Sequence, residues 1–96
     1  MSAPLVLDGD LTVFAVAALK DRWMAALNED VSLTLDGSGV SEVDGAGIQL
    51  LLSTCKEAQQ RGGSLTLQSP SAQLLEALEL IDLRADFCAP TLETSE

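Results

Sequence analysis

The sequence of 96 residues is long enough for one small domain, and 47% of its residues are hydrophobic against 21% charged, which is a globular composition. A net charge of −10 opposes binding to nucleic acid or to anionic membrane surfaces by charge attraction. The N-terminus has no basic segment, and no apolar run approaches the length of a membrane span. We therefore expect a cytoplasmic protein that does not insert into a membrane.

The cysteine and histidine content argues against a metal or cofactor site. The chain has no histidine, and Cys55 and Cys88 do not form a CxxC pair. Cys55 falls on the apolar side of a predicted helix, where a buried free thiol is expected. No cofactor and no metal are expected.

The first elements follow from apolar spacing. The segment "PLVLDG" predicts a strand over residues 4–9, which is closed by Gly9. Apolar residues then recur at helical spacing from Thr12, which we expect to cap a first helix that ends near Asn28. The alternation in "VSLTLD" predicts a strand over residues 31–36. We interpret the following "GSGVSEV" as a loop, because it is rich in glycine and serine.

A second helix is predicted over residues 44–61. Asp44 suits its N-cap, because a carboxylate can accept hydrogen bonds from the free amides of the first turn. The pair Gly62 and Gly63 favours a left-handed end to the helix. The segment "SLTLQS" then predicts a strand over residues 64–69.

A third helix, "AQLLEALELID", is predicted to start after Ser71 as its cap. Leu83, Phe87 and Cys88 are expected to add a short final strand or a packed tail. We expect one domain over residues 1–90, and a disordered tail over residues 91–96.

The order strand, helix, strand, helix, strand, helix predicts an α/β fold. Alternation at this spacing is typical of βαβ units, which form a small, mostly parallel sheet with helices packed on it. In such folds, sites form where strands end and helices begin. The junction over residues 36–47 joins the clearest strand to the clearest helix, and it is the candidate site.

The residues of this junction can be compared with what several kinds of site require. A phosphate cradle would need GxxxxGK[ST], and the lysine is missing. Asp36, Glu42 and Asp44 could converge on a metal ion, but their spacing matches no EF-hand loop. Catalysis by Ser38 or Ser41 would need a base, and the chain has no histidine. The simplest interpretation is that Asp44 caps the helix and the glycines turn the chain, which leaves room for a protein-docking surface.

The segment "LTLDGSGVSEVDGAGIQLLL" resembles the signature of STAS domains, the fold of anti-anti-sigma factors. Members carry a strand ending in Asp, a few small residues, and then a hydrophobic-Asp-[Ser/Thr]-x-Gly-hydrophobic segment that opens a helix. Leu35 and Asp36 match the strand end, and Val43, Asp44 and Gly47 match the helix start. The likeness extends over residues 31–88, including "RGGSLTLQSPSAQLLEALELIDL".

The resemblance implies a non-enzymatic regulatory module that acts like an anti-sigma factor antagonist. In phospho-switching members, the residue after the Asp is a Ser or Thr that a partner kinase phosphorylates, which breaks the complex. This position is Gly45 here, and it has no hydroxyl to accept phosphate. We expect the partner-docking surface to comprise these residues: Asp36, Ser38, Ser41, Glu42, Asp44, Gly45, Ala46, Gly47 and Gln49.

The resemblance leaves two classes of protein partner open. One is a signalling protein: an anti-sigma or histidine-kinase-like protein, or a chemotaxis protein. The other is the ATPase of a lipid-trafficking ABC transporter, because "LELIDLRADF" is loosely similar to the end of small STAS subunits of such transporters. Those subunits favour a Thr where this chain has Gly45.

One departure from the family concerns the start of the sheet. STAS domains usually have two strands before the first helix, whereas this sequence predicts only the strand over residues 4–9. A missing strand leaves an unpaired edge. A homodimer through that edge is a further hypothesis.

Overall fold

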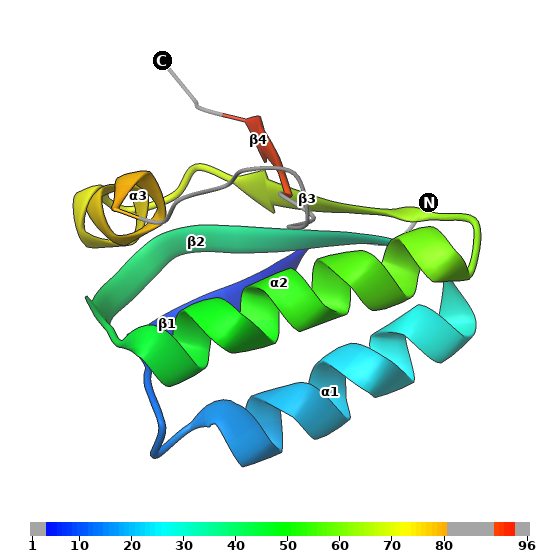
Figure 1. Cartoon of the computed structure of the whole chain (residues 1–96), viewed down its shortest axis with the longest axis horizontal. Coiled ribbons are helices and arrows are strands. Elements are labelled where there is room, and N and C mark those ends of the chain that lie inside the picture. Colours follow the sequence, from blue (N-terminus) through cyan, green and yellow to red (C-terminus); the bar gives the residue numbers. More distant parts are fainter. Residues whose placement is uncertain (1–3, 81–89, 94–96) are drawn as a thin grey trace.

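The computed structural model describes residues 4–80 and 90–93. In this part of the chain, parallel strands form a four-stranded sheet in the order β1-β2-β3-β4 (Figure 1). The strands are β1 (Leu5–Leu11), β2 (Ser32–Val43), β3 (Ser64–Gln68) and β4 (Thr91–Glu93). The helices between them are α1 (Val16–Glu29), α2 (Gly45–Gln60) and α3 (Ala72–Glu79). The predicted α/β fold with a parallel sheet is confirmed.

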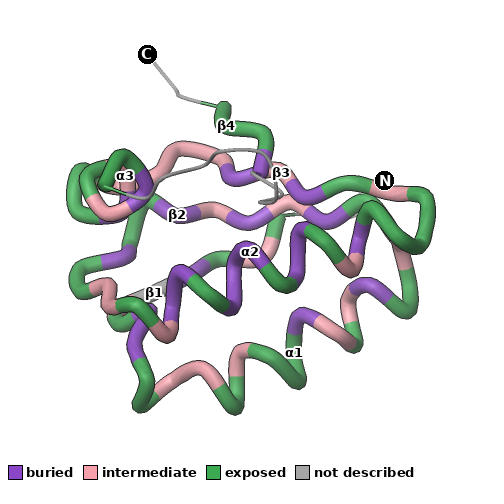
Figure 2. Tube along the Cα trace, in the orientation of Figure 1, coloured by how far each residue is buried: buried purple, intermediate pink, exposed green. Residues whose placement is uncertain are grey.

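The two central strands bury one face of the sheet. Leu33 and Leu35 of β2 are buried in register with Leu65 and Leu67 of β3. The residues between them, such as Thr34, are less buried, as the two-residue period of a strand requires. Helices α1 and α2 lie side by side over the leucine face, where the buried positions gather (Figures 1 and 2).

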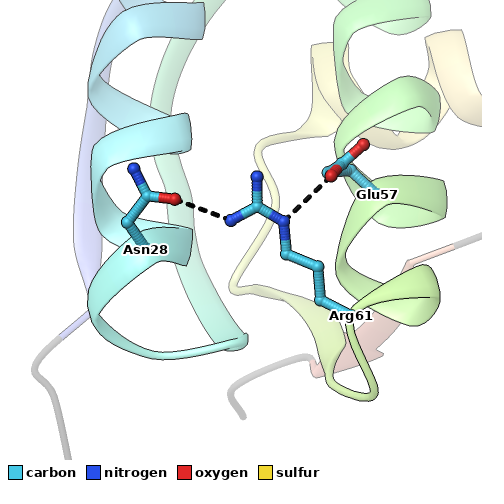
Figure 3. A network of polar contacts seen from close by, with 3 residues as sticks. All are labelled: Asn28, Glu57 and Arg61. Atoms are coloured by element: carbon cyan, nitrogen blue, oxygen red, sulfur yellow. Dashed lines mark hydrogen bonds and ion pairs between the residues drawn. The ribbon is translucent and has the colours of Figure 1, made fainter.

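A polar contact joins the C-terminal ends of these two helices (Figure 3). The Arg61 guanidinium donates through Nη1 to Asn28 Oδ1 at 2.8 Å and through Nε to Glu57 Oε2 at 2.9 Å. The three side chains lie near the surface, so we expect a contribution of about 1 kcal/mol or less. The apolar core, with Trp23 of α1 buried in it, carries most of the packing.

The structure corrects the predicted start of α1. Strand β1 continues to Leu11 instead of ending at Gly9, because Leu11 pairs with Val43 of β2. The helix therefore starts later, and Ala15 occupies its N-cap without a side-chain hydrogen bond. Thr12 is not the cap: its side chain is buried, and its carbonyl accepts hydrogen bonds in the turn before the helix.

The predicted loop after residue 36 is also wrong, because β2 continues to Val43. Glycine and serine have low strand preference, but β1 supplies backbone partners along this stretch, including Gly9 for Val40. The pairing contains register shifts, as expected where small residues permit bulges. Gly37 is buried, because Leu74 of α3 packs over it.

Other local predictions are confirmed. Asp44 caps α2 by accepting from the Gly47 amide, and Ser71 caps α3 by accepting from the Leu74 amide. Gly62 follows α2 with a φ of 89°, in the left-handed region that glycine favours.

The structure tests only some of the predictions for the C-terminal segment and for the cysteines. Thr91–Glu93 pair with β3 as strand β4, within the segment expected to be a tail. The proposed final strand or packed tail at Leu83, Phe87 and Cys88 lies outside the described residues. Cys55 is buried as predicted, but it is disulfide-bonded, which corrects the expected free thiol.

Thr54 offers a test of the core. Its side chain is fully buried in α2, and its hydroxyl has no hydrogen-bond partner within the described part of the chain. We predict that Thr54→Val raises the free energy of unfolding by about 1 kcal/mol, because it removes a buried unsatisfied oxygen at constant shape. Thr54→Ser, which keeps the hydroxyl and loses a methyl group, should lower it by about 1 kcal/mol. Urea titration measures both, and a valine variant no more stable than wild type would contradict the interpretation.

Candidate docking site

Asp44 joins three segments where β2 meets α2. Its amide donates to the Leu11 carbonyl at the end of β1, at 3.2 Å. Its Oδ2 accepts from the Val13 amide at 3.0 Å, in the turn between β1 and α1. Its Oδ1 accepts from the Gly47 amide at 3.1 Å, in the first turn of α2. One side chain therefore fixes the β1–α1 turn against the start of α2.

These amides also act on the charge of Asp44. Hydrogen bonds from the Val13 amide, and then from the Gly47 amide, hold the pKa of Asp44 below its ordinary value of 3.8. The carboxylate is therefore anionic at neutral pH. It places a negative charge beside the helix N-terminus, where the helix dipole favours it.

The two motif glycines have opposite surroundings. A Cβ at Gly47 would collide with the Leu11 carbonyl, so this residue lets α2 approach the end of β1 closely. A Cβ at Gly45 would meet nothing within 4 Å. Gly45 is exposed at the first position of α2, and its surface is open to another molecule.

A shallow apolar groove lies between α2 and α3, next to Gly45. Its walls come from the first turns of α2 and from the end of α3, and the residues are Val43, Asp44, Gly45, Ile48, Gln49, Leu52, Ala77 and Leu80. Leu80 is 85% exposed. An adjoining depression continues over Ser41, Glu42, Gln73 and Glu76. The groove thus has an apolar floor and a polar, acidic border.

Some of the predicted docking residues line the groove or the adjoining depression, and the others lie elsewhere. Asp44, Gly45 and Gln49 line the groove, and Ser41 and Glu42 lie in the adjoining depression. Ala46 is partly buried, and Gly47 is buried where the first turn of α2 meets the end of β1.

Asp36 and Ser38 are not among the residues that line the groove or the depression. They lie in the middle of β2 and bond each other, with the Ser38 hydroxyl donating to Asp36 Oδ1 at 2.7 Å. The Ser38 amide, and then this hydroxyl, lower the pKa of Asp36. Their shared role is local: they hold the course of the strand.

The structure does not assemble the alternative sites. Among the described residues, no group of three or more carboxylate or thiol side chains could hold a metal ion, so Asp36, Glu42 and Asp44 do not converge. The Ser41 hydroxyl donates to the Gly9 carbonyl at 3.3 Å and not to a side-chain base.

Sequence reasoning missed the contributions of α3 and of the β1–α1 turn. Ala77 and Leu80 form one wall of the groove. The turn that bonds Asp44 through the Val13 amide carries the exposed side chains of Val13 and Phe14. A signal was present for Phe14, because it falls outside the apolar spacing of Val16, Trp23 and Leu27 in α1.

Comparison with known proteins decides the family. A family model described as "Mlab, STAS domain" matches residues 2–91. The chain belongs to the STAS domain family. The resemblance seen in the sequence is therefore confirmed, and the motif that carries it is the β2–α2 junction described above.

Individual relatives of this STAS domain are distant. The anti-sigma-B factor antagonist of Bacillus subtilis (strain 168) is 24% identical over 76 residues, which cover 79% of this chain and 70% of the relative. A protein of Thermotoga maritima assigned as an anti-sigma factor antagonist superposes with a TM-score of 0.77 at 19% identity, over 94% of this chain and 78% of its own. The structure of the anti-sigma factor antagonist SpoIIAA in its unphosphorylated form superposes with a TM-score of 0.70 at 18% identity, over 100% of this chain and 86% of its own.

These matches confirm the SpoIIAA-like fold. In the described part of the chain, no helix has the length and apolar character to cross a membrane.

The two glycines give a matched pair of substitutions. We predict that Gly47→Ala lowers the free energy of unfolding by about 3 kcal/mol, because the added methyl group would overlap the Leu11 carbonyl. Gly45→Ala should stay within about 0.5 kcal/mol of wild type, since its methyl group would project into open space. Chemical denaturation compares the two, and equal losses would contradict the described packing.

Asp44 gives a prediction about pH. The folded pKa of Asp44 is lowered, so its contribution to stability is present above the unfolded value of 3.8 and is lost as pH falls through the folded pKa. Asp44→Asn should therefore be less stable than wild type at pH 7, and the gap should close in acid. Urea titrations of both proteins from pH 7 to below pH 3.8 measure the gap, and a gap that does not change with pH would argue against this role.

Proposed function

We propose that this STAS domain is a non-enzymatic module that regulates a protein partner by docking at the β2–α2 junction. Gly45 is the observation that carries the proposal: it is exposed at the start of α2, nothing lies within 4 Å of the position of its missing side chain, and an apolar groove adjoins it. A partner backbone can approach such a position closely.

Gly45 also affects how docking at this site is regulated. Position 45 lacks the hydroxyl that phospho-switching STAS domains use, so phosphate cannot be added there. The nearby hydroxyls of Ser38 and Ser41 already bond Asp36 and the Gly9 carbonyl. We propose that docking at this site is not released by phosphorylation of residue 45.

A signalling protein is the leading class of partner. The relative from Bacillus subtilis and both solved structures are named as anti-sigma factor antagonists, which supports a partner of the anti-sigma class. A histidine-kinase-like or chemotaxis partner, and a cytoplasmic location, stay predictions from the sequence. The ATPase of a lipid-trafficking ABC transporter is the second candidate. It rests on the loose similarity of the segment "LELIDLRADF" to the end of small STAS subunits of such transporters.

The proposal includes self-association of the domain as a homodimer. Strand β1 lies at one edge of the sheet, and within the described residues it is the strand that precedes α1. A homodimer through this edge stays a prediction, which light scattering at micromolar concentration tests through the molar mass.

Substitution at residue 45 tests the docking site. We predict that Gly45→Glu abolishes partner capture, because a long charged side chain would stand where the partner approaches, whereas Gly45→Ala keeps the fold and most of the binding. Both variants and wild type serve as baits in extract of the native cells. A captured protein is identified by mass spectrometry, and its affinity for each purified variant is measured by calorimetry.

The identity of the captured protein separates the two partner classes. A kinase-like or chemotaxis protein retained by wild type and Gly45→Ala, but not by Gly45→Glu, supports the signalling proposal. An ABC ATPase with the same pattern supports the second candidate. Equal affinity for wild type and Gly45→Glu would count against docking at this site.

A further inference from the structure

Phe14 is the most exposed large apolar side chain in the described part of the chain. It is 95% exposed, and its neighbour Val13 is 57% exposed. Aromatic residues make up only 3% of the sequence, and Trp23 is buried in the core. An aromatic ring left in water is unusual, and rings of this kind often anchor protein interfaces.

The segment that carries Phe14 is held in place. The Thr12 carbonyl accepts from the Ala15 amide at 2.9 Å and from the Val16 amide at 3.1 Å, which closes the turn behind Phe14. On its other side, the Val13 amide donates to Asp44 at 3.0 Å. A ring presented on an ordered turn loses little conformational freedom when it binds, which favours an anchoring role.

This turn lies on the same side of the molecule as the groove. Figure 1 shows the start of α1, the start of α2 and α3 along one side. Asp44 connects the parts directly, because it bonds the turn through Val13 and also lines the groove with Leu80. The turn that carries Phe14 and the groove lined by Gly45 and Leu80 therefore adjoin at Asp44, and together they are called the composite face.

The charged residues around the groove indicate which kind of protein binds to the composite face. Asp44, Glu42 and Glu76 border the groove and its adjoining depression, and none of the described residues that line either one is a lysine or arginine. The amides that lower the pKa of Asp44 also keep it ionised. A second copy of this chain, with a net charge of −10, would bring like charges together on this face. A partner with basic residues would be attracted to it.

We infer that the composite face binds a protein whose surface has an apolar pocket bordered by lysine or arginine, with Phe14 inserted in that pocket. This inference rests on the proposed function, and it adds a second contact segment and the chemical character of the partner. Complementary charge steers the encounter, and the desolvated ring supplies the affinity.

Site-specific photo-crosslinking in the native cells tests the inference. Phe14 is replaced with the photo-crosslinking residue benzoylphenylalanine, and Gln49, which lines the groove, is replaced separately in the same way. Half-exposed Leu92 on β4 provides the control position. We expect Phe14 and Gln49 to crosslink to the same protein and Leu92 not to do so. Mass spectrometry of the Phe14 product should locate apolar residues with lysine or arginine beside them.

Each result separates this inference from the proposed function. A product from Gln49 but not from Phe14 overturns the inference and leaves the proposed function standing. No product from either position counts against both. A product at twice the mass of this chain identifies a second copy of the chain, which overturns the inference of a partner with basic residues. A crosslinked site on another protein that has no lysine or arginine beside it also overturns that inference.

The partner identified in this way then gives a quantitative check. Phe14→Ala should weaken its binding by about 30-fold, the scale of an interface hot spot. Val6→Ala, which shortens an exposed residue on β1, should leave the affinity unchanged. Affinity that is unaffected by Phe14→Ala would show that the ring is near the partner but not its anchor.

Discussion

The carboxylate of Asp44 is the constraint on which the working end of this domain depends. It accepts hydrogen bonds from two amides that are far apart in sequence, those of Val13 and Gly47. Its own amide bonds the end of β1. These bonds converge on one residue, so Asp44 ties together the β1–α1 turn, the end of the sheet and the start of α2. A partner that docks there meets a prearranged surface and does not have to order it.

The motif that opens α2 separates structural from functional roles within four residues. Gly47 is required by packing, since any side chain there would meet the Leu11 carbonyl. Gly45 is under no such restriction, because space is open around it. The fold therefore does not require glycine at residue 45, and the proposed close approach of another protein would account for it.

The sequence predicted what depends on local pattern. Alternating leucines such as Leu33 and Leu35 identified the central strands, and Asp44 identified the helix start, because each signal acts over a few residues. The extension of β2 to Val43 was missed, since its glycines and serines become a strand only when β1 pairs with them. The groove was missed for the same reason: Leu80 and Gly45 meet only through the tertiary packing of α3 near α2.

The missing hydroxyl and the acidic border have a joint consequence for regulation. In a phospho-switched STAS domain, added phosphate brings negative charge to a docking surface and separates the partners. Here the surface already carries the charges of Asp44 and Glu42, and residue 45 cannot gain another. A partner suited to this face must tolerate negative charge at all times. If a partner docks here as proposed, phosphate at residue 45 cannot release it, and a change in the partner that favours a state with lower affinity for the face is one route to release.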